Sequence, residues 1–291
     1  MKRYIALKKI VELGSFTKAS EELGYTQSAI SQMVASLEDE LGMVLLTRSR
    51  NGVSLTPDGR RIYGDVESFV NDYRRVKERA AAIRGLNVGT VRIGTIASVS
   101  AHWLPRLMAE FNELHPGVTF TIHQGDYAVM NQWLHQGEVD FCLMNPSAVT
   151  NPSFTCEPVK DGAMLAIVPE GHPYAGLDAI PLEALCEEPF ILLEEGGYYE
   201  PLEVFRSCGL KPDVRYTIHD DYAIMTMVEA GLGVSILAEL VLGRTSYRIC
   251  RRRTEPPVTR SLAVVYRKST PLPEAAKRFI ALLHEHEQDL P

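Results

Sequence analysis

Apolar side chains near the N-terminus recur every three or four positions, and a glycine ends each run. This period places the apolar residues on one face of a helix. The pattern predicts three helices, over residues 2–13, 16–23 and 27–41. Ser15 and Thr26 are favoured N-caps for the second and third helices. Gly14, Gly24 and Gly42 are suited to the helix ends, where glycine readily adopts positive φ.

The second and third helices are separated by a short turn that contains Gly24, which is the arrangement of a DNA-binding helix-turn-helix. Ala19 is small enough for the two helices to cross closely, and Ile30 is placed to anchor the third helix in the core. Polar side chains at the start of the third helix would reach base edges in the major groove. These residues are Thr26, Gln27, Ser28, Ser31 and Gln32. The alternative is a plain helical hairpin with a solvated polar face.

Two short apolar runs, residues 44–47 and 53–55, flank an Asn-Gly pair at 51–52. Asn-Gly between such runs is typical of a tight β-hairpin turn. Arg48 and Arg50 lie on this hairpin. We expect them to form a basic wing against phosphate or the minor groove.

The next pattern is that of one long helix. Thr56 is an N-cap and Pro57 suits the first helical position, and the helix is expected over residues 57–85. Large apolar residues then alternate at steps of four and three, as in a coiled-coil seam. The seam residues are Ile62, Val66, Phe69, Tyr73, Val76, Ala80 and Ile83. Burying each large one is worth about 1.5 kcal/mol or more, so we expect a homodimer. The alternative is that the stripe packs on its own chain.

Beyond residue 87 the pattern changes to alternating strands and helices. Strands are expected at 90–96, 118–123 and 139–144, with helices at 102–115 and 127–136 between them. A second set has strands at 164–168, 190–193, 214–218 and 233–237 and helices at 199–207 and 221–230, and a strand at 261–266 and a helix at 273–286 follow. This order predicts an α/β fold with parallel sheets in two lobes. Open α/β sheets bind ligands at the carboxyl ends of their strands, so a cleft between the lobes is the expected site.

Charge is distributed unevenly along the 291 residues. Residues 1–87 contain 14 Lys and Arg against 11 Asp and Glu, and the remainder contains 16 against 26. A basic head on an acidic body is expected when only the head meets phosphate. No apolar run reaches 18 residues, which predicts no membrane span. The N-terminus is charged and amphipathic, unlike a signal peptide, so a cytoplasmic protein is expected.

Sequence motifs for catalysis or metal binding are absent. The chain has no HExxH, GxSxG, GxGxxG or Walker pattern, so neither an enzyme nor a metal or cofactor is expected. Its five cysteines are scattered without CxxC spacing, and Cys208 has no nearby partner for redox sensing. The run Arg251 to Arg253 is interpreted as a solvated surface, with a second DNA contact as the alternative. A solute-binding protein and, after it, an enzyme are the rival classes.

Several ordered motifs in the first 59 residues together resemble the LysR-type transcriptional regulators. They are residues 14–20 (GSFTKAS), 26–31 (TQSAIS), Leu37-Glu38, Leu41-Gly42 and 55–59 (LTPDG). The resemblance implies a sequence-specific, effector-controlled DNA-binding regulator with three parts: a winged helix-turn-helix at 1–57, a linker and dimerisation helix at 58–87, and an effector-binding domain at 88–291. The last part would resemble type 2 periplasmic binding proteins, with one lobe at about 88–161 and 267–291 and the other at about 162–266.

The same resemblance implies the partners and the effector contacts. Its partners would be double-stranded DNA, RNA polymerase and other copies of the chain, as an antiparallel homodimer or a homotetramer. The effector loops fall on Ser98, Val99, Ser100, Asp126, Tyr127, Asn145, Glu194, Glu195, His219 and Asp220. Because carboxylates crowd these strand ends, we hypothesise an effector with amine or hydroxyl groups and not a simple dicarboxylate. The alternative is that most of these carboxylates face solvent or cap helices.

Overall fold

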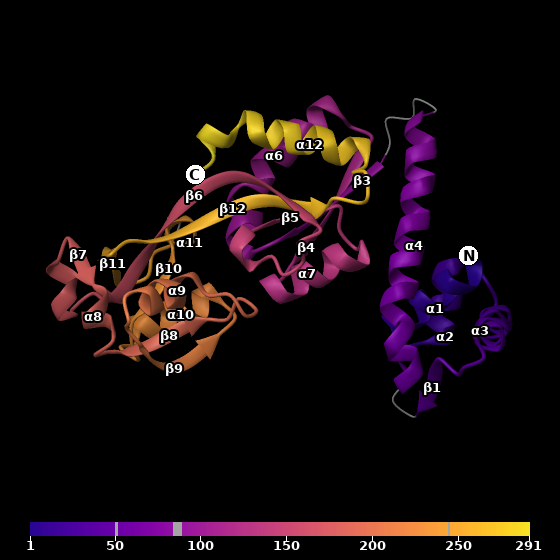
Figure 1. Ribbon diagram of the computed structural model, residues 1–291, viewed down its shortest axis with the longest axis horizontal. Coiled ribbons are helices and arrows are strands. Elements are labelled where there is room, and N and C mark those ends of the chain that lie inside the picture. Colours follow the sequence, from indigo (N-terminus) through magenta and orange to yellow (C-terminus); the bar gives the residue numbers. More distant parts are fainter. Residues whose placement is uncertain (50–51, 84–88, 244) are drawn as a thin grey trace. The chain divides into compact units, whose positions relative to one another are not determined.

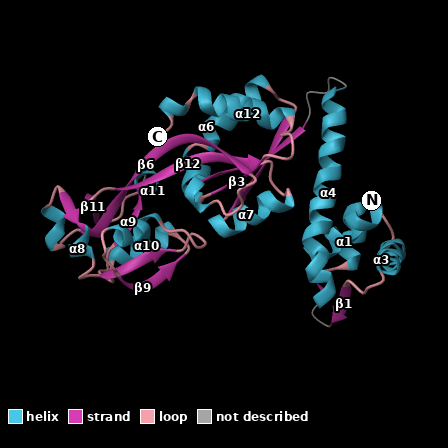
Figure 2. Ribbon diagram, viewed as in Figure 1, coloured by secondary structure: helices cyan, strands magenta, loops and turns pink. Residues whose placement is uncertain are grey.

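The computed structural model describes residues 1–49, 52–83, 89–243 and 245–291 (Figure 1). Its contacts divide the chain into two compact units. The first contains Met1–Leu86 and His135–Glu138, and the second contains Asn87–Leu134 and Val139–Pro291. Helices make up most of the first unit, and the second mixes helices with strands (Figure 2). The finer division into three parts, with bounds at 57 and 87, stays a prediction.

The first unit begins with three helices, α1 (Lys2–Leu13), α2 (Phe16–Leu23) and α3 (Gln27–Leu41), as the apolar period predicted. Ser15 Oγ accepts a hydrogen bond from the Lys18 N–H, and Thr26 Oγ1 accepts one from the Ala29 N–H. Gly24 and Gly42 end their helices with φ of 70° and 66°. The predicted helix-turn-helix is therefore confirmed, together with its caps.

A two-stranded hairpin follows, made of β1 (Leu46–Ser49) and β2 (Gly52–Leu55). The Glu38 carboxylate of α3 accepts hydrogen bonds from the N–H groups of Leu45 and Leu46, at 2.7 and 3.1 Å. The Val53 N–H donates to the carbonyl of Gly14. These bonds attach the hairpin to the helices on both of its sides.

The long helix α4 (Pro57–Ile83) starts against this hairpin. Thr56 Oγ1 accepts a hydrogen bond from the Gly59 N–H at 2.9 Å. A Cβ atom at position 59 would collide with the carbonyl oxygen of Leu45, so only glycine allows this close approach. The Leu-Thr-Pro-Asp-Gly motif therefore provides both the helix cap and the contact with the preceding segment.

Two residues of the predicted seam on α4 are covered by the chain itself. Val66 is only 4% exposed and belongs to the core formed by α1, α2 and α3, and Ile62 packs against the same core. Both residues were expected in an intersubunit seam. They instead pack on their own chain, because the first part of the α4 stripe lies against α1, α2 and α3.

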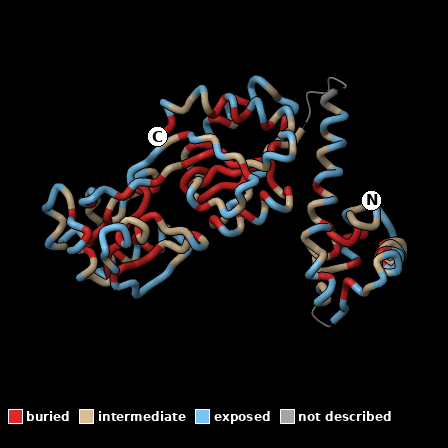
Figure 3. Tube along the Cα trace, in the orientation of Figure 1, coloured by how far each residue is buried: buried red, intermediate tan, exposed pale blue. Residues whose placement is uncertain are grey.

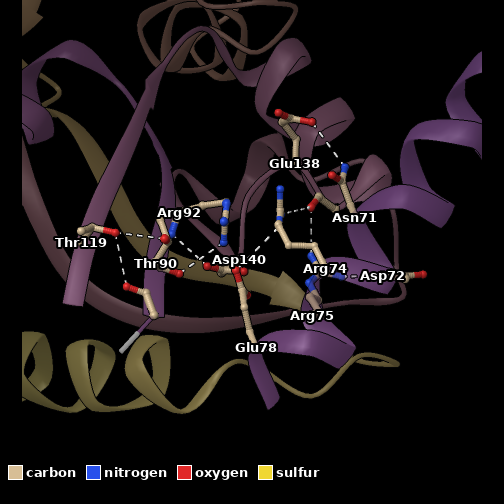
Figure 4. Close-up of polar contacts among 12 residues, drawn as sticks. Asn71, Asp72, Arg74, Arg75, Glu78, Thr90, Arg92, Thr119, Glu138 and Asp140 are labelled. Atoms are coloured by element: carbon tan, nitrogen blue, oxygen red, sulfur yellow. Dashed lines mark hydrogen bonds and ion pairs between the residues drawn. The ribbon is translucent and has the colours of Figure 1, made fainter. Parts of the chain in front are cut away.

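Polar contacts join α4 to the segment 135–138, which contains the end of α7 (Tyr127–Gln136) and belongs by its contacts to the first unit (Figure 4). Asn71 Nδ2 donates to the Gln136 carbonyl at 2.9 Å. Arg75 donates to the Gly137 carbonyl at 3.2 Å. Lys8 of α1 forms an ion pair with Glu138 at 2.9 Å and also donates to Asn71. Nothing in the sequence pattern singled out this segment.

The second unit is built on one continuous mixed sheet. Its strand order is β4-β3-β5-β12-β6-β11-β7, and β10 pairs with β6 beside this path. The strands are β3 (Gly89–Thr95), β4 (Val118–Gln124), β5 (Phe141–Met144), β6 (Phe154–Pro169), β7 (Ala179–Pro181), β10 (Ser235–Ala238), β11 (Ile249–Glu255) and β12 (Val258–Arg267). A separate parallel pair consists of β8 (Pro189–Leu193) and β9 (Asp213–Ile218).

The expected parallel sheet is correct only in part. β3 runs parallel to β4 and β5, but β12 is antiparallel to both β5 and β6. The predicted strands 164–168 and 261–266 are parts of the long strands β6 and β12. These two strands extend through both lobes, so the large sheet is mixed, and only the separate β8–β9 pair is parallel throughout.

The helices of the second unit follow the prediction with one correction. They are α5 (Ala97–His102), α6 (Leu104–Leu114), α7, α8 (Leu182–Leu185), α9 (Glu200–Ser207), α10 (Asp221–Glu229), α11 (Glu239–Leu242) and α12 (Glu274–Glu285). The helix expected at 102–115 is confirmed as α6, and the correction is the additional short helix α5 before it, which follows β3 and meets α6 at Trp103. The short elements β7, α8 and α11 and the strand β11, which holds Arg251–Arg253, were not predicted.

Separate hydrophobic cores mark the two lobes of the second unit, where buried backbone concentrates in the strands (Figure 3). One core draws on residues between 91 and 159 and between 262 and 290. The other two clusters draw on residues between 164 and 258. No helix in the described part of the chain is long and apolar enough to cross a membrane.

Candidate functional site

The N-terminal half of α3 presents a polar surface. Thr26, Gln27, Ser28 and Gln32 are exposed, and Ser31 is half-buried. The opposite face of the helix is buried, as Ile30, Val34 and Leu37 are at most 3% exposed. This division is what a recognition helix requires, because one face must hold the core while the other meets base edges.

The hairpin places Arg48 next to this surface. Its Nη2 donates a hydrogen bond to Ser31 Oγ at 3.0 Å, and its guanidinium lies 4.1 Å from the centre of the Phe16 ring. Arg48 thus connects the wing to both helices of the motif. The other predicted wing residue, Arg50, lies outside the described residues.

The second half of α4 carries an exposed apolar stripe. Phe69, Tyr73 and Val76 are 49%, 39% and 64% exposed, and Ala80 is exposed as well. Phe69 also makes an edge-to-face contact with Tyr4, with ring centroids 5.1 Å apart. The side chain of Ile83 lies outside the described part of the chain. These four residues are the part of the predicted seam that remains open to a partner.

A cavity of about 440 Å³ lies in the second unit, at the carboxyl ends of β3, β4 and β8. It is lined by Ile96, Ala97, Ser98, Gln124, Gly125, Asp126, Leu193, Glu194, Glu195, His219, Asp221 and Arg260. Five residues assigned from the resemblance line it, namely Ser98, Asp126, Glu194, Glu195 and His219. Its size is that of a pocket for a small metabolite.

The other five assigned residues are not among those that line the cavity. Val99 is buried, and Ser100 donates its hydroxyl to the Ala97 carbonyl. Asp220 caps α10 by accepting from the Ala223 N–H at 2.7 Å. Tyr127 and Asn145 are buried and both donate to Glu200 Oε1, at 2.8 and 2.9 Å.

The sequence reasoning missed Arg260, the single guanidinium among the lining side chains. It is 5% exposed, and its Nη2 donates to Ser98 Oγ at 2.9 Å. Its Nη1 lies 3.8 Å from Glu195 Oε1. The available signal was an arginine directly before the last predicted strand, which begins at Val258 in the structure and not at Ser261.

Glu195 and Glu200 form a buried carboxyl pair beside Arg260. Glu195 is 7% exposed and Glu200 is 2% exposed. Burial raises the pKa of Glu195 well above its usual range, and repulsion by Glu200 adds to this rise while Arg260 opposes it. Burial also raises the pKa of Asp221. Glu195 therefore keeps its proton to a higher pH than an exposed glutamate does, with Glu200 beside it as a hydrogen-bond partner.

Metal or thiol chemistry has little support in the described residues. They contain no group of three or more His, Cys, Asp or Glu side chains placed to hold a metal ion. Burial raises the pKa of the Cys142 thiol, which disfavours the reactive thiolate.

Comparisons with known proteins match two segments of the chain to two family models. Residues 1–60 match the family model of bacterial regulatory helix-turn-helix proteins of the lysR family, and residues 84–288 match the LysR substrate binding domain. The chain is 33% identical over 285 residues to YvbU, an uncharacterised HTH-type transcriptional regulator of Bacillus subtilis (strain 168), covering 95% of each chain.

Solved structures resemble the whole chain as well. HinK, a LysR family transcriptional regulator from Pseudomonas aeruginosa, has 26% identity and a TM-score of 0.63, with 99% of each chain covered. Full-length CbnR, which was solved in complex with its target DNA, shares the fold with 21% identity and a TM-score of 0.70, covering 98% of this chain and 97% of its own. Both family models and the full-length relative lead to one conclusion: this chain belongs to the LysR family of transcriptional regulators, with a DNA-binding helix-turn-helix and an effector-binding domain.

Proposed function

We propose that α3 reads DNA sequence through Gln27, Ser28 and Gln32 in the major groove. The observation that carries this proposal is the exposure of these side chains on a helix whose other face is buried. Amide and hydroxyl groups hydrogen-bond to base edges, and amides pair well with adenine. Thr26 and Ser31 extend the same surface, while Arg48 and Arg50 contact phosphate from the wing.

A second copy of the chain delivers the second head. Phe69, Tyr73, Val76 and Ala80 supply the exposed apolar stripe for a homodimer along α4. Two heads held in this way would bind half-sites separated by about 34 Å or a multiple of it. Further association of dimers gives the tetramer, and contact with RNA polymerase completes the regulatory role.

The cavity of the second unit binds the effector. Ser98, Glu195 and Arg260 are its most buried polar lining residues, and they come from different parts of the chain. A ligand that contacts all three would alter how the lobes meet. Control is exerted by this binding and not by catalysis, and the protein works in the cytoplasm with its DNA.

Footprinting on the DNA beside the protein's own gene tests the proposal. We expect protection of two half-sites on one face of the duplex at low ionic strength, and a change in the footprint when a metabolite occupies the cavity. Gln27→Ala should alter which sequences are protected, whereas Glu187→Gln, at an exposed site in the second unit, should not. Failure to bind duplex DNA at low salt would contradict the proposed function.

A further inference from the structure

Two of the four carboxyl groups that line the cavity are already engaged by the protein. Asp126 Oδ1 accepts a hydrogen bond from the Val129 N–H at 2.9 Å, as a helix cap does. Glu194 Oε1 accepts from the Gly196 N–H at 3.0 Å and from the Tyr199 hydroxyl at 2.6 Å. The alternative that these acids cap helices therefore fits Asp126, whereas Glu194 binds a loop N–H and a tyrosine hydroxyl.

Glu195 is different, because it lines the cavity without a donor of its own. Its one side-chain hydrogen-bond partner among the described residues is Glu200, and no backbone N–H donates to its carboxyl group, although the side chain is more than nine-tenths buried. Arg260 approaches only to 3.8 Å, beyond hydrogen-bonding distance. A buried carboxylate in this state requires a donor, and the cavity is where one would enter.

The neighbouring acid is also incompletely satisfied. Glu200 Oε1 accepts from Tyr127 and Asn145, but its buried Oε2 has no hydrogen-bond donor among the described residues. A proton shared between Glu195 and Glu200 satisfies both groups when the cavity is empty. Gly196 allows the loop after Glu195 to lie close to Asp126, since a Cβ there would come within 2.6 Å of Asp126 Oδ1.

An anionic ligand would find less favourable surroundings. The one lining guanidinium, Arg260, already donates to Ser98 Oγ and lies near Glu195. An added carboxylate would face Glu194, Glu195 and Asp221 in the same cavity. Such a ligand would oppose ionisation of the buried Glu195 and Asp221, because adjacent carboxylates repel one another where water is excluded.

We propose that the effector of this cavity carries a protonated amine that donates to Glu195, and that its binding releases the proton shared by Glu195 and Glu200. The inference rests on the proposed function, because it names the ligand class of the same site. The ammonium replaces the shared proton as the donor to Glu195, and the released proton passes to solvent. The charged and titratable groups around the pair are Arg260 from β12, Asp221 from α10 and Tyr127 from α7.

Three probes of equal chain length test the ligand class with the full-length protein: cadaverine, glutarate and 1,5-pentanediol. We expect cadaverine to raise the melting temperature by about 2–4 °C near saturation, while glutarate and pentanediol leave it unchanged. Stabilisation by glutarate alone, or no response to cadaverine up to its solubility limit, would overturn the proposal.

Substitutions test whether cadaverine binds at Glu195. Glu195→Gln should weaken cadaverine binding by about tenfold or more, as expected for loss of a charged acceptor. The matched control Glu187→Gln removes the same charge from an exposed site in the same lobe and should bind normally. Equal affinities for all three proteins would contradict a site at Glu195.

Calorimetry in buffers of different ionisation enthalpy tests proton release. The observed heat should vary with the buffer and indicate release of up to about one proton per site. Glu200→Gln should bind cadaverine with much less release, because its amide supplies a donor to Glu195 without a titrating proton. Buffer-independent heats in the unmodified protein would contradict the release step.

A DNA-binding measurement on the same preparation separates the two levels of failure. If the protein binds duplex DNA and only glutarate binds the cavity, the proposed function stands and the amine inference fails. If cadaverine binds but duplex DNA does not at low salt, the inference about the cavity stands and the regulatory function fails.

Discussion

Arg48 of the wing donates a hydrogen bond to Ser31 of the recognition helix, with 3.0 Å between Nη2 and Oγ. The contact fixes the orientation of the wing relative to α3. It uses one of the five guanidinium donors, so the remainder are available for DNA. Ser31 therefore has two roles in the proposed function, since its hydroxyl accepts from Arg48 and is also proposed to face the groove. Substitutions at Ser31 will combine both effects, which makes Arg48 and Gln27 the cleaner tests.

Arg48→Ala should weaken DNA binding about equally for all sequences. Loss of one phosphate contact lowers the slope of log K against log salt by about 1. Binding titrations at several salt concentrations measure the slope. Arg206→Ala on α9, an exposed arginine of the second unit, serves as the control and should leave the slope unchanged.

Gln27→Ala should instead change sequence preference. We propose that its exposed amide contacts a base edge, so its loss should reduce discrimination at one position by about 1–3 kcal/mol. Selection of bound sequences from a random pool measures the preference. A uniform loss of affinity with an unchanged preference would mean that Gln27 contacts only the backbone.

Glu38→Ala should destabilise the head by about 1–3 kcal/mol, because it leaves the N–H groups of Leu45 and Leu46 without their acceptor. Glu38→Gln is the matched comparison, since its amide oxygen can still accept. Denaturant unfolding, followed by the helix signal, measures the difference in unfolding free energy between the two variants. Equal losses for both variants would show that charge, and not the acceptor, matters at this position.

Periodicity predicted the head closely because its helices pack locally and end at glycines. Gly24 and Gly42 allow the positive φ of a helix end, and this property is visible in the sequence. The sequence pattern could not predict features that depend on tertiary contacts. Val66 looked like a seam residue because a heptad pattern does not say which partner covers each position, and here the chain's own head covers it.

The cavity was predictable in place but less so in composition. The family resemblance assigned Ser98 and Glu195, and both line the cavity at the carboxyl ends of strands, where open α/β sheets bind ligands. Arg260 escaped notice because it reaches the site from β12, far from the other lining residues in sequence. Glu200 escaped notice because it is the first residue of α9 and not part of a strand end. Tyr127 was placed at the correct loop, but its side chain turns inward to Glu200.

Val76→Asp should dissociate the dimer with little change in the stability of the head. Val76 is 64% exposed, so the charge is solvated in the monomer but buried in a seam. It is a cleaner variant than Phe69→Asp, which also loses the contact with Tyr4. Sedimentation velocity measures the oligomeric state. Val44→Asp, at a 63% exposed apolar site in the head, is the control and should remain dimeric.

The pH dependence of stability should report the raised pKa of Glu195. The unfolded carboxyl titrates near its ordinary value of 4.5, while burial and Glu200 hold the folded value higher. Between these two values the folded state binds more protons than the unfolded state. Stability therefore falls as pH rises through this window, and it is fully retained below it.

Glu195→Gln has no proton to lose and escapes this decline. Its melting temperature, relative to that of the unmodified protein, should therefore increase as pH is raised from about 4.5 towards neutrality. Asp221, whose pKa is also raised by burial, remains in both proteins and largely cancels in the comparison. Glu187→Gln should show a constant difference, because its side chain is exposed. A constant difference for Glu195→Gln as well would mean that Arg260 holds Glu195 ionised throughout, with no proton shared in the empty cavity.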